Sequence, residues 1–419
     1  MKLNSSIRNI LLIWLGWALV MLLFQHWLGM RVTLKRPDNV LGWTGSETTT
    51  HSQSDKPYLI EPLLNEHVSW DSEYYLGIAI GGYDDPAIQA IPADFNWGTM
   101  SDRFCSVGQE TNCISLSYAF FPLYPLVTRI VAMPLGLFSL STIARYTLAA
   151  VLVSLLGTLG AMLSLYSMTR SSLGDEGGVR AAFYLLIFPS GFFLAQVYTE
   201  GLFIGLTFGS LAFMMTRKRY LSALLAALAV WARPGGAILL IPLAIVWFID
   251  KTWQKGWKVA LGRGLVALSP LFSYGIWSFT SMADKFHLVE ESFFGRGFFA
   301  LVPSATAWGQ AIHSIFQNNL QTKFYYGLEF AVTLLAVLAC ILFLKECPEL
   351  SLFGLLMIVF AFTSGSAQGM VRYVLVVPAL FWVLARWGRN SAFDRVWSLL
   401  SILLMGLEAL LFSFDFWVA

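Results

Sequence analysis

The sequence predicts an all-α, polytopic membrane protein with a single integral membrane domain over residues 1–419, and two observations support this prediction. The chain is 57% hydrophobic and only 12% charged, whereas an ordinary soluble domain carries about 25% charged residues. Apolar runs that reach or approach the length of about 20 residues needed to cross a bilayer recur along the chain. The net charge of +2 is too small to indicate a nucleic-acid partner.

Taken in order, the apolar runs predict about 11 membrane segments. A divided run between Tyr220 and Asp250 contains ARPGG at its midpoint, and proline breaks a helix. We therefore expect a hairpin that enters and leaves the membrane on one side, with Arg233 and Pro234 at its turn. The other runs lie at 9–29, 142–168, 181–199, 201–216, 260–282, 325–344, 350–363, 371–385 and 396–417.

Basic residues predict the orientation, since short cytoplasmic loops are enriched in Lys and Arg. Here they collect before the first run, at 217–219, at 251–263 and at 386–395. This pattern predicts a cytoplasmic N-terminus, an extracytoplasmic C-terminus and two extracytoplasmic loops. The first loop covers residues 30–140 and carries interfacial helices, and the second covers 284–320.

The stretch WDSEYYLGIAIGGYDD in the first loop begins at Trp70 and is the candidate active segment. Trp70 suits a membrane interface, and YYLGIAI is expected to form a short amphipathic surface helix that ends at Gly81. Asp71 precedes this helix and has two compatible interpretations, an N-cap and an oriented catalytic carboxylate. Trp70 and Tyr74 are candidates for contact with a substrate.

Two further features of the first loop supply substrate-binding candidates. Asp84 and Asp85 precede a proline and are typical of a turn, but their place beside the active segment keeps them as candidates. AFFPLYPLVTRI at 119–130 combines aromatic residues with two prolines that fix the chain as it enters a helix. We expect Phe121 and Tyr124 there to lie at headgroup level, as a platform for a lipid chain or sugar ring or as a plain anchor.

Three charged residues lie beside apolar runs on the predicted extracytoplasmic side. A charge within a membrane helix costs about 2.5–3.5 kcal/mol, so it usually has a partner or a task. Glu200, Arg233 and Arg372 are each interpretable as interfacial charges that reach water. Their common side with Asp71 favours a phosphate-binding site instead, because the planar donors of arginine suit phosphate oxygens.

The histidines and cysteines predict no metal site and no cofactor. Cys105 and Cys113 lie close together in the polar first loop, so a disulfide is possible there and is left open. FFGRGFF at 293–299 is interpreted as an interfacial or substrate-covering loop. Three histidines are interpreted as surface or loop residues without a second ligand at metal spacing: His67, His287 and His313.

The ordered motifs WD with YYLGIAIGGY, AFFPLYPL, PSGFFLAQVYTEGLF, WARPGG and GMVRYVLVVPALF resemble the PIG-V family of GPI mannosyltransferases and its prokaryotic relatives. The resemblance implies a GT-C-type glycosyltransferase that uses a polyprenyl-phosphate sugar. It places the expected base on Asp71 and donor phosphate binding on Arg372 and Arg233. The GY-x-x-acidic pattern of the family is met only loosely, by Asp84 and Asp85.

The predicted reaction is inverting transfer of a hexose, mannose by resemblance, to an extracytoplasmic lipid or glycan acceptor. A sugar on lipid phosphate already has a good leaving group, so one base and one or two cations suffice. A single base implies inversion, unlike the paired carboxylates of retaining hydrolysis. Short outer segments favour a bacterial inner membrane over the ER. The competing interpretations are a transporter or flippase of a lipid-linked glycan, and a non-catalytic subunit.

Overall fold

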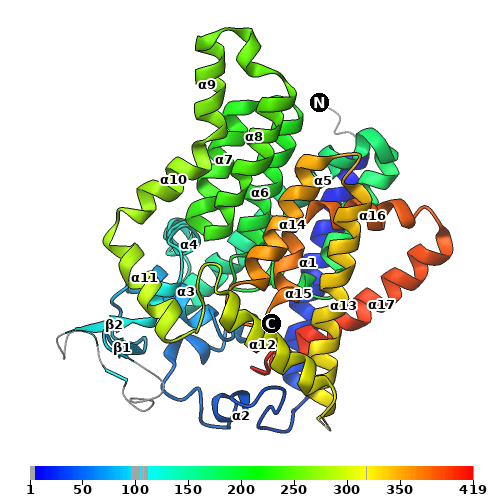
Figure 1. Ribbon diagram of the computed structural model, residues 1–419. Helices are drawn as coiled ribbons and strands as arrows, with labels where there is room; N and C mark the ends of the chain where they lie inside the picture. The colour runs from blue at the N-terminus through cyan, green and yellow to red at the C-terminus, as the bar shows by residue number, and fades with distance from the viewer. Residues whose placement is uncertain (1–4, 96–103, 106, 108–111, 318, 419) are drawn as a thin grey trace.

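The computed structural model describes residues 5–95, 104–105, 107, 112–317 and 319–418 and has an all-α architecture (Figure 1). Among these residues the only strands are β1 (Ala90–Pro92) and β2 (Cys113–Ser115), which pair antiparallel as a small ribbon. Cys105 and Cys113 form a disulfide beside this ribbon. The predicted helical fold class is therefore confirmed.

Long apolar helices make the chain an integral membrane protein. Four are long and apolar enough to cross a membrane: α1 (Ser5–Arg31), α5 (Thr142–Ile187), α13 (Leu320–Phe343) and α17 (Ser391–Phe412). Two bent pairs also qualify: α9 (Trp257–Ala267) with α10 (Ser269–Ser278), and α15 (Met370–Tyr373) and η7 (Val374–Val376) with α16 (Pro378–Trp387). The other apolar helices are shorter, so the predicted number of about 11 segments stays a prediction.

The shorter apolar helices account for the remaining runs. They are α4 (Leu123–Leu135), α6 (Glu200–Met215), α7 (Arg219–Ala232), α8 (Leu240–Ile249) with the preceding 3₁₀ helix η5 (Pro234–Leu239), and α14 (Pro348–Phe362). The predicted runs 142–168 and 181–199 begin on opposite sides of a kink in α5 at Gly174, whose φ is +74°, and the second helical part ends at Ile187. The run 371–385 is likewise not straight, since its two helical parts meet at 83°.

The predicted hairpin between Tyr220 and Asp250 is present. Helix α7 ends at Ala232, Arg233 adopts an extended backbone, and η5 and α8 return. The two ends of the hairpin meet, because Arg219 Nη2 donates to Asp250 Oδ2 at 2.5 Å. Arg233 therefore lies at the turn of the hairpin, opposite the end where Arg219 contacts Asp250.

Helix α5 lies at the centre and packs against α1, α4, α6 and α16. Its closest partner is α6, and small residues permit the approach. A Cβ atom on Gly201 would lie 2.2 Å from the carbonyl oxygen of Ser154, and one on Gly157 would lie 2.4 Å from the carbonyl oxygen of Gly201. This contact fixes the first turn of α6, where Glu200 stands.

The two predicted loops share one end of the molecule, the lower end in Figure 1, whereas α9 and the N-terminus lie at the upper end. The first loop contains α2 (Thr44–Glu47), α3 (Ser72–Ile80), η1 (Pro57–Leu59), η2 (Asn65–His67) and η3 (Leu116–Ala119). The second contains α11 (Ser281–Ser292) and α12 (Leu301–Ile315). Two further 3₁₀ helices are η4 (Gly191–Ala195) and η6 (Thr252–Lys255).

The prediction of an amphipathic surface helix after Asp71 is wrong. Helix α3 ends at Gly81 as expected, but seven of its residues are buried, including the charged Glu73. It packs against η1, α4 and α5 instead of lying flat with one wet face. An element buried on most sides holds its first residue more firmly than a surface helix would.

Candidate functional site

Asp71 stands at the start of α3, and its carboxylate does not cap that helix. Its backbone N–H donates to the hydroxyl of Tyr198 at 3.2 Å, and its Oδ2 accepts from Arg372 Nη1 at 2.9 Å. Within the described chain Oδ1 has no hydrogen-bond partner, and 22% of the side chain is exposed. The N-cap interpretation is thus wrong, and the carboxylate is oriented by an arginine.

Arg372 is positioned by the short helix α15. Gly369 precedes this helix with φ +81°, and the carboxylate of Glu329 on α13 accepts from the backbone N–H groups of Gly369 at 2.8 Å and Val371 at 2.9 Å. A carboxylate at a helix N-terminus is favourable for its dipole. The Arg372 side chain is only 4% exposed and lies 5.3–5.6 Å from three ring centroids. Those rings belong to Phe193, Tyr198 and Tyr373.

Glu200 joins Arg372 to Arg233. Its Oε1 lies 3.2 Å from Arg372 Nε and accepts from Arg233 Nη2 at 2.5 Å, while Arg233 Nε donates to Thr199 Oγ1 at 2.6 Å. Glu200 is 1% exposed and Arg233 is 16% exposed. The break in the hairpin places Arg233 here, and the close packing of α5 on α6 places Glu200.

Asp71, Arg372, Glu200 and Arg233 therefore form one chain of alternating charges, which we call the acid–arginine network. Its two central members are closed to solvent, and its two ends are partly open. Buried Oε2 of Glu200 and Nε of Arg372 have no hydrogen-bond partner with good geometry among the described residues. Incompletely satisfied buried polar groups are unusual and occur at functional sites.

Arg296 and Glu290 also belong to this region, and the sequence analysis missed both. The Arg296 guanidinium interacts electrostatically with Tyr373 most strongly, then with Glu290, Arg372 and Asp71, and in the described parts of the chain no carboxylate lies within 4.0 Å of it. Burial raises the pKa of Glu290 to about 7, against the opposing effect of Arg296. The only sequence signal was the FFGRGFF loop.

The FFGRGFF loop at 293–299 is held by backbone hydrogen bonds to the residues that follow α14. The backbone N–H of Gly297 donates to the carbonyl of Ser364 at 2.8 Å, and that of Ala300 donates to the carbonyl of Thr363 at 2.9 Å. The ring of Phe294 meets the edge of Tyr74 at 6.4 Å. The loop connects α11 to α12 and brings Arg296 toward the network.

The two aromatic residues next to Asp71 have different surroundings. Trp70 has φ +51° and packs edge to face with Trp43 and Trp417 at 5.8 and 5.2 Å. Tyr74 stacks on Phe120 at 4.7 Å. The substrate-binding roles predicted for Trp70 and Tyr74 stay predictions, at positions adjoining the network.

Asp84 and Asp85 lie outside the acid–arginine network. Asp85 is 5% exposed, and its carboxylate accepts from the Tyr58 hydroxyl at 2.5 Å and from the backbone N–H of Ala87 at 2.9 Å. Asp84 is exposed and accepts from the Tyr118 hydroxyl at 3.1 Å. This arrangement fits the turn interpretation, and their predicted role in substrate binding has no further geometric support.

Phe121 and Tyr124 are buried, so the expected exposed platform for a lipid chain or sugar ring is not present at these two residues. Phe121 is 4% exposed and stacks on Trp277 of α10 at 4.5 Å. Tyr124 is fully buried, and its hydroxyl donates to the carbonyl of Ala150 on α5 at 3.0 Å.

His67 is buried rather than a surface residue, with 1% of it exposed. Burial lowers its pKa to about 4, so the imidazole is neutral near pH 7. No group of three or more His, Cys, Asp or Glu side chains suited to a metal ion occurs in the described ranges. His67 is therefore a buried, neutral side chain at the end of η2.

No protein-family model and no curated protein matches this chain. Among solved structures it is similar to ArnT from Cupriavidus metallidurans bound to undecaprenyl phosphate, with a TM-score of 0.45, 15% identity, and coverage of 86% of this chain and 75% of that one. It is also similar to the Archaeoglobus fulgidus oligosaccharyltransferase in complex with Zn and sulfate, with a TM-score of 0.47, 14% identity and coverage of 96% and 53%.

A third similar structure is the archaeal oligosaccharyltransferase AglB from Archaeoglobus fulgidus in complex with an inhibitory peptide and a dolichol-phosphate. Here the TM-score is 0.45 and the identity 13%, over 96% of this chain and 56% of that one. This chain thus spans about half the length of the oligosaccharyltransferases.

Proposed function

We propose that this protein is an inverting, GT-C-type glycosyltransferase that moves a hexose from a polyprenyl-phosphate sugar to an extracytoplasmic acceptor. The observation that carries the proposal is the environment of Asp71. It is the partly exposed carboxylate at one end of the network, with Oδ2 held by Arg372 and Oδ1 without a partner among the described residues. A carboxylate fixed by one oxygen presents the other to an acceptor hydroxyl in a defined direction.

The proposed step uses Asp71 as the general base. The acceptor oxygen attacks the anomeric carbon while Asp71 takes the hydroxyl proton, and the bond from that carbon to the phosphate oxygen breaks with its electron pair on the phosphate. Negative charge therefore grows on the leaving phosphate. Guanidinium groups placed beforehand at that position stabilise the charge without reorganisation.

The donor phosphate needs a cation whose charge is not already balanced. Arg372 and Arg233 each pair with a carboxylate, so their positive charges are largely compensated before a substrate binds. Arg296 lacks such a partner within the described chain, and its neighbour Glu290 is partly protonated near pH 7. We assign the first contact with the phosphate to Arg296, with Arg372 and Arg233 completing it.

The finer identity of the reaction rests on the motif resemblance. If the donor is the β-linked mannosyl phosphate that the PIG-V family uses, inversion gives an α-mannoside. The disulfide between Cys105 and Cys113 supports an oxidising, extracytoplasmic location for the first loop. A bacterial inner membrane is the proposed compartment, with a lipid or glycan as acceptor.

The test is transfer of radiolabelled sugar from a panel of polyprenyl-phosphate sugars, mannose included, into membranes that contain the wild type or Asp71→Asn. Label that appears with the wild type alone supports the enzyme and names the donor. Label that is independent of Asp71 contradicts the base. Binding of a lipid-linked glycan without transfer from any donor would identify a transporter instead.

A further inference from the structure

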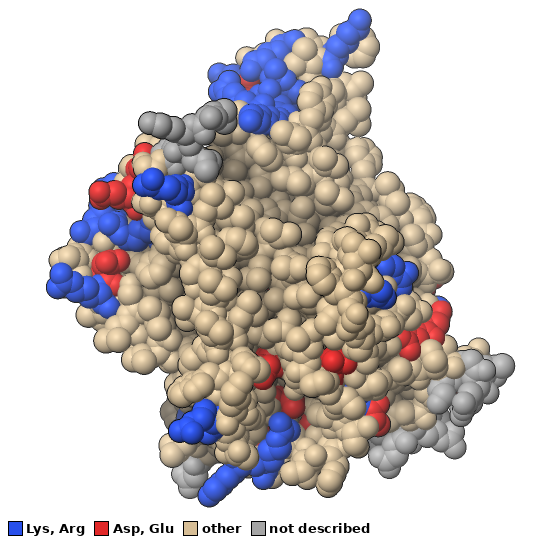
Figure 2. Space-filling view, turned by 180° about the vertical axis from the view of Figure 1, so that it is seen from behind, with Lys and Arg blue, Asp and Glu red and all other residues tan. Residues whose placement is uncertain are grey.

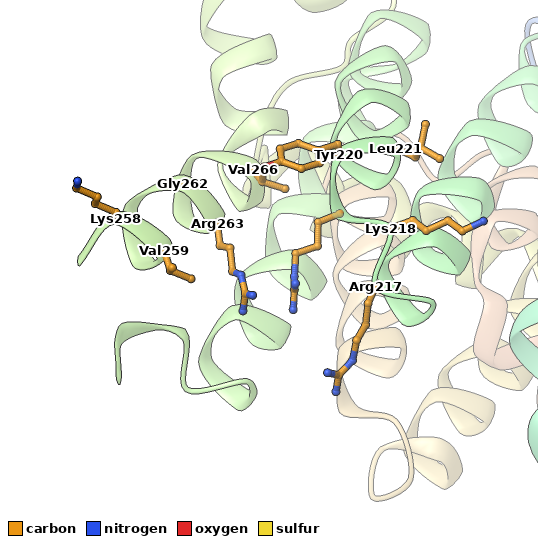
Figure 3. Close-up of a pocket in the computed structure, with 10 residues that line it drawn as sticks. Arg217, Lys218, Tyr220, Leu221, Lys258, Val259, Gly262, Arg263 and Val266 are labelled. Atoms are coloured by element: carbon orange, nitrogen blue, oxygen red, sulfur yellow. The ribbon is translucent and has the colours of Figure 1, made fainter. Parts of the chain in front are cut away.

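A second charged site lies at the end of the molecule away from Asp71. It is a cavity of about 490 Å³ between the start of α7 and helix α9 (Figures 1 and 3). The residues that line it include five cations and no carboxylate. We call it the basic cavity, and its cations are Arg217, Lys218, Arg219, Lys258 and Arg263.

The charges of the basic cavity are only partly compensated. Asp250 outside the lining pairs with Arg219 at 2.5 Å and lies 3.9 Å from Arg217, so one carboxylate faces several cations. Nη1 of Arg263 is buried and has no hydrogen-bond partner in the described part of the chain. A buried donor without an acceptor is costly, and an anion in the cavity would satisfy it.

Figure 3 shows Arg217 and Arg263 extending to the same side of the cavity, whereas Lys218 points away. The ammonium of Lys218 lies 5.6 Å from the ring centroid of Phe213. Lys258 also points away in Figure 3, is exposed, and its ammonium lies 5.7 Å from the ring centroid of Trp257. The cations that extend to a common side of the cavity are therefore Arg217 and Arg263.

Exposed aromatic and apolar side chains lie in the cavity and next to it in the chain. Tyr220 and Leu221 of its lining are 83% and 45% exposed, and Trp257 at the start of α9 is 71% exposed. Exposed Trp and Tyr are typical of the boundary between water and membrane. Figure 2 shows one group of basic side chains at the top of the molecule, others at its sides and lower end, and a broad surface with few charges between them. A cationic hollow on such a boundary lies at the depth of phospholipid headgroups.

We propose that the basic cavity binds the headgroup phosphate of one anionic phospholipid, whose acyl chains run along the apolar side chains of α7 and α9. Cationic pockets between helices are suited to such headgroups, and each Lys or Arg near an anionic surface contributes about 1 kcal/mol. The site is separate from the acid–arginine network and does not depend on the proposed transfer reaction. Its ligand joins the hairpin of α7 and α8 to α9.

The test measures binding of fluorescent phosphatidylglycerol to the purified full chain in neutral detergent micelles. Arg263→Gln and Arg217→Gln should each weaken binding about fivefold, the equivalent of about 1 kcal/mol for one cation. Arg395→Gln is the matched control, since Arg395 is an exposed arginine on α17 outside the cavity. It should bind the lipid like the wild type.

Two competitors separate the sources of the phosphate. Unlabelled phosphatidylglycerol should displace the probe, whereas millimolar inorganic phosphate and phosphatidylcholine should not. Equal displacement by inorganic phosphate would overturn the lipid assignment in favour of a soluble phosphate. Equal displacement by phosphatidylcholine, or unchanged binding in both variants, would overturn the anionic site. Because the Arg217 side chain is 75% exposed, its variant should fold even if Arg263→Gln does not.

Discussion

The two charged regions of this protein differ in how their charges are balanced. In the acid–arginine network two carboxylates face two guanidinium groups, and Glu200 and Arg372 at its centre are almost closed to solvent. In the basic cavity five cations line an open space, and Asp250 pairs with only part of them. The ion pairs of the network orient the carboxylate of Asp71 for a reaction. The cations of the basic cavity outnumber the nearby carboxylate, so they can bind an anionic ligand.

This contrast also explains the position of Arg296. Like Arg263 of the basic cavity, it has no carboxylate within 4.0 Å among the described residues, but it stands beside the network. The proposed active site thus combines a balanced part that orients the base with an unbalanced part that attracts the donor. Substitutions that change the balance at each position test this division.

Asp71→Asn should have the largest effect on activity. The amide keeps the shape of the side chain but cannot accept a proton as a base, and a general base contributes about 10²- to 10⁴-fold to a rate. We expect kcat for sugar transfer to fall by about that factor, measured with the radiolabelled donor. Asp94→Asn is the control, because Asp94 is an exposed aspartate of the same loop. Transfer near the wild-type rate in Asp71→Asn would refute the assignment.

Arg372→Gln should most strongly reduce stability. Arg372 is the shared partner of Asp71 and Glu200, and removal of one partner from a buried ion pair costs about 3–5 kcal/mol. Arg233→Gln should cost less, because Glu200 keeps Arg372 and Arg233 is 16% exposed. Thermal unfolding in detergent compares the two variants.

The double variant Arg372→Gln with Glu200→Gln sharpens this test. It removes one charge of each sign, so it should unfold at a higher temperature than Arg372→Gln alone. An additive loss in the double variant would mean that the two side chains are not coupled.

Arg296→Gln should weaken donor use without a comparable loss of stability. A hydrogen bond to a charged group is worth about 1.5–3 kcal/mol, so we expect the KM for the polyprenyl-phosphate sugar to rise about 10- to 100-fold. The KM for the acceptor should change little. Equal increases in both KM values would point to a general disturbance of the loop between α11 and α12.

The sequence predicted those parts of the fold that depend on local composition. The apolar runs and the break at ARPGG suffice for the hairpin, whose closure is seen in the pair Arg219 and Asp250. The orientation predicted from the basic loops placed Asp71, Glu200, Arg233 and Arg372 on the same side of the membrane. The structure connects these four side chains by ion pairs. Each of these inferences uses neighbours in the chain or the cost of a charge in an apolar run.

The sequence could not show which groups touch. Asp71 and Arg372 are 301 positions apart, so the sequence left the N-cap interpretation, which needs only the next residues, open beside the catalytic one. Arg296 lies in a loop without a specific motif, and its proposed role in donor binding depends on its distance from other charged side chains, which the sequence does not show. Phe121 looked like an interfacial aromatic residue, because its burial depends on Trp277 of α10, a residue 156 positions further along the chain.

The pH dependence should be the smallest effect, and it concerns Glu290. Burial raises the pKa of this carboxyl from 4.5 to about 7, so the folded chain binds more protons than the unfolded chain between these values. Its contribution therefore makes stability fall as pH rises through that window and become constant above it. Glu73 contributes in the same direction, because burial raises its pKa to about 7 as well.

Donor binding separates Glu290 from Glu73. As Glu290 ionises near pH 7, its negative charge beside Arg296 opposes the donor phosphate, so the donor KM should rise with pH. Glu290→Gln should remove this rise and keep the low-pH KM, whereas Glu73→Gln should leave it in place. A rise that persists in Glu290→Gln would show that Glu290 does not compete with the donor for Arg296. The donor phosphate would then be bound by Arg372 and Arg233, which already pair with carboxylates in the network.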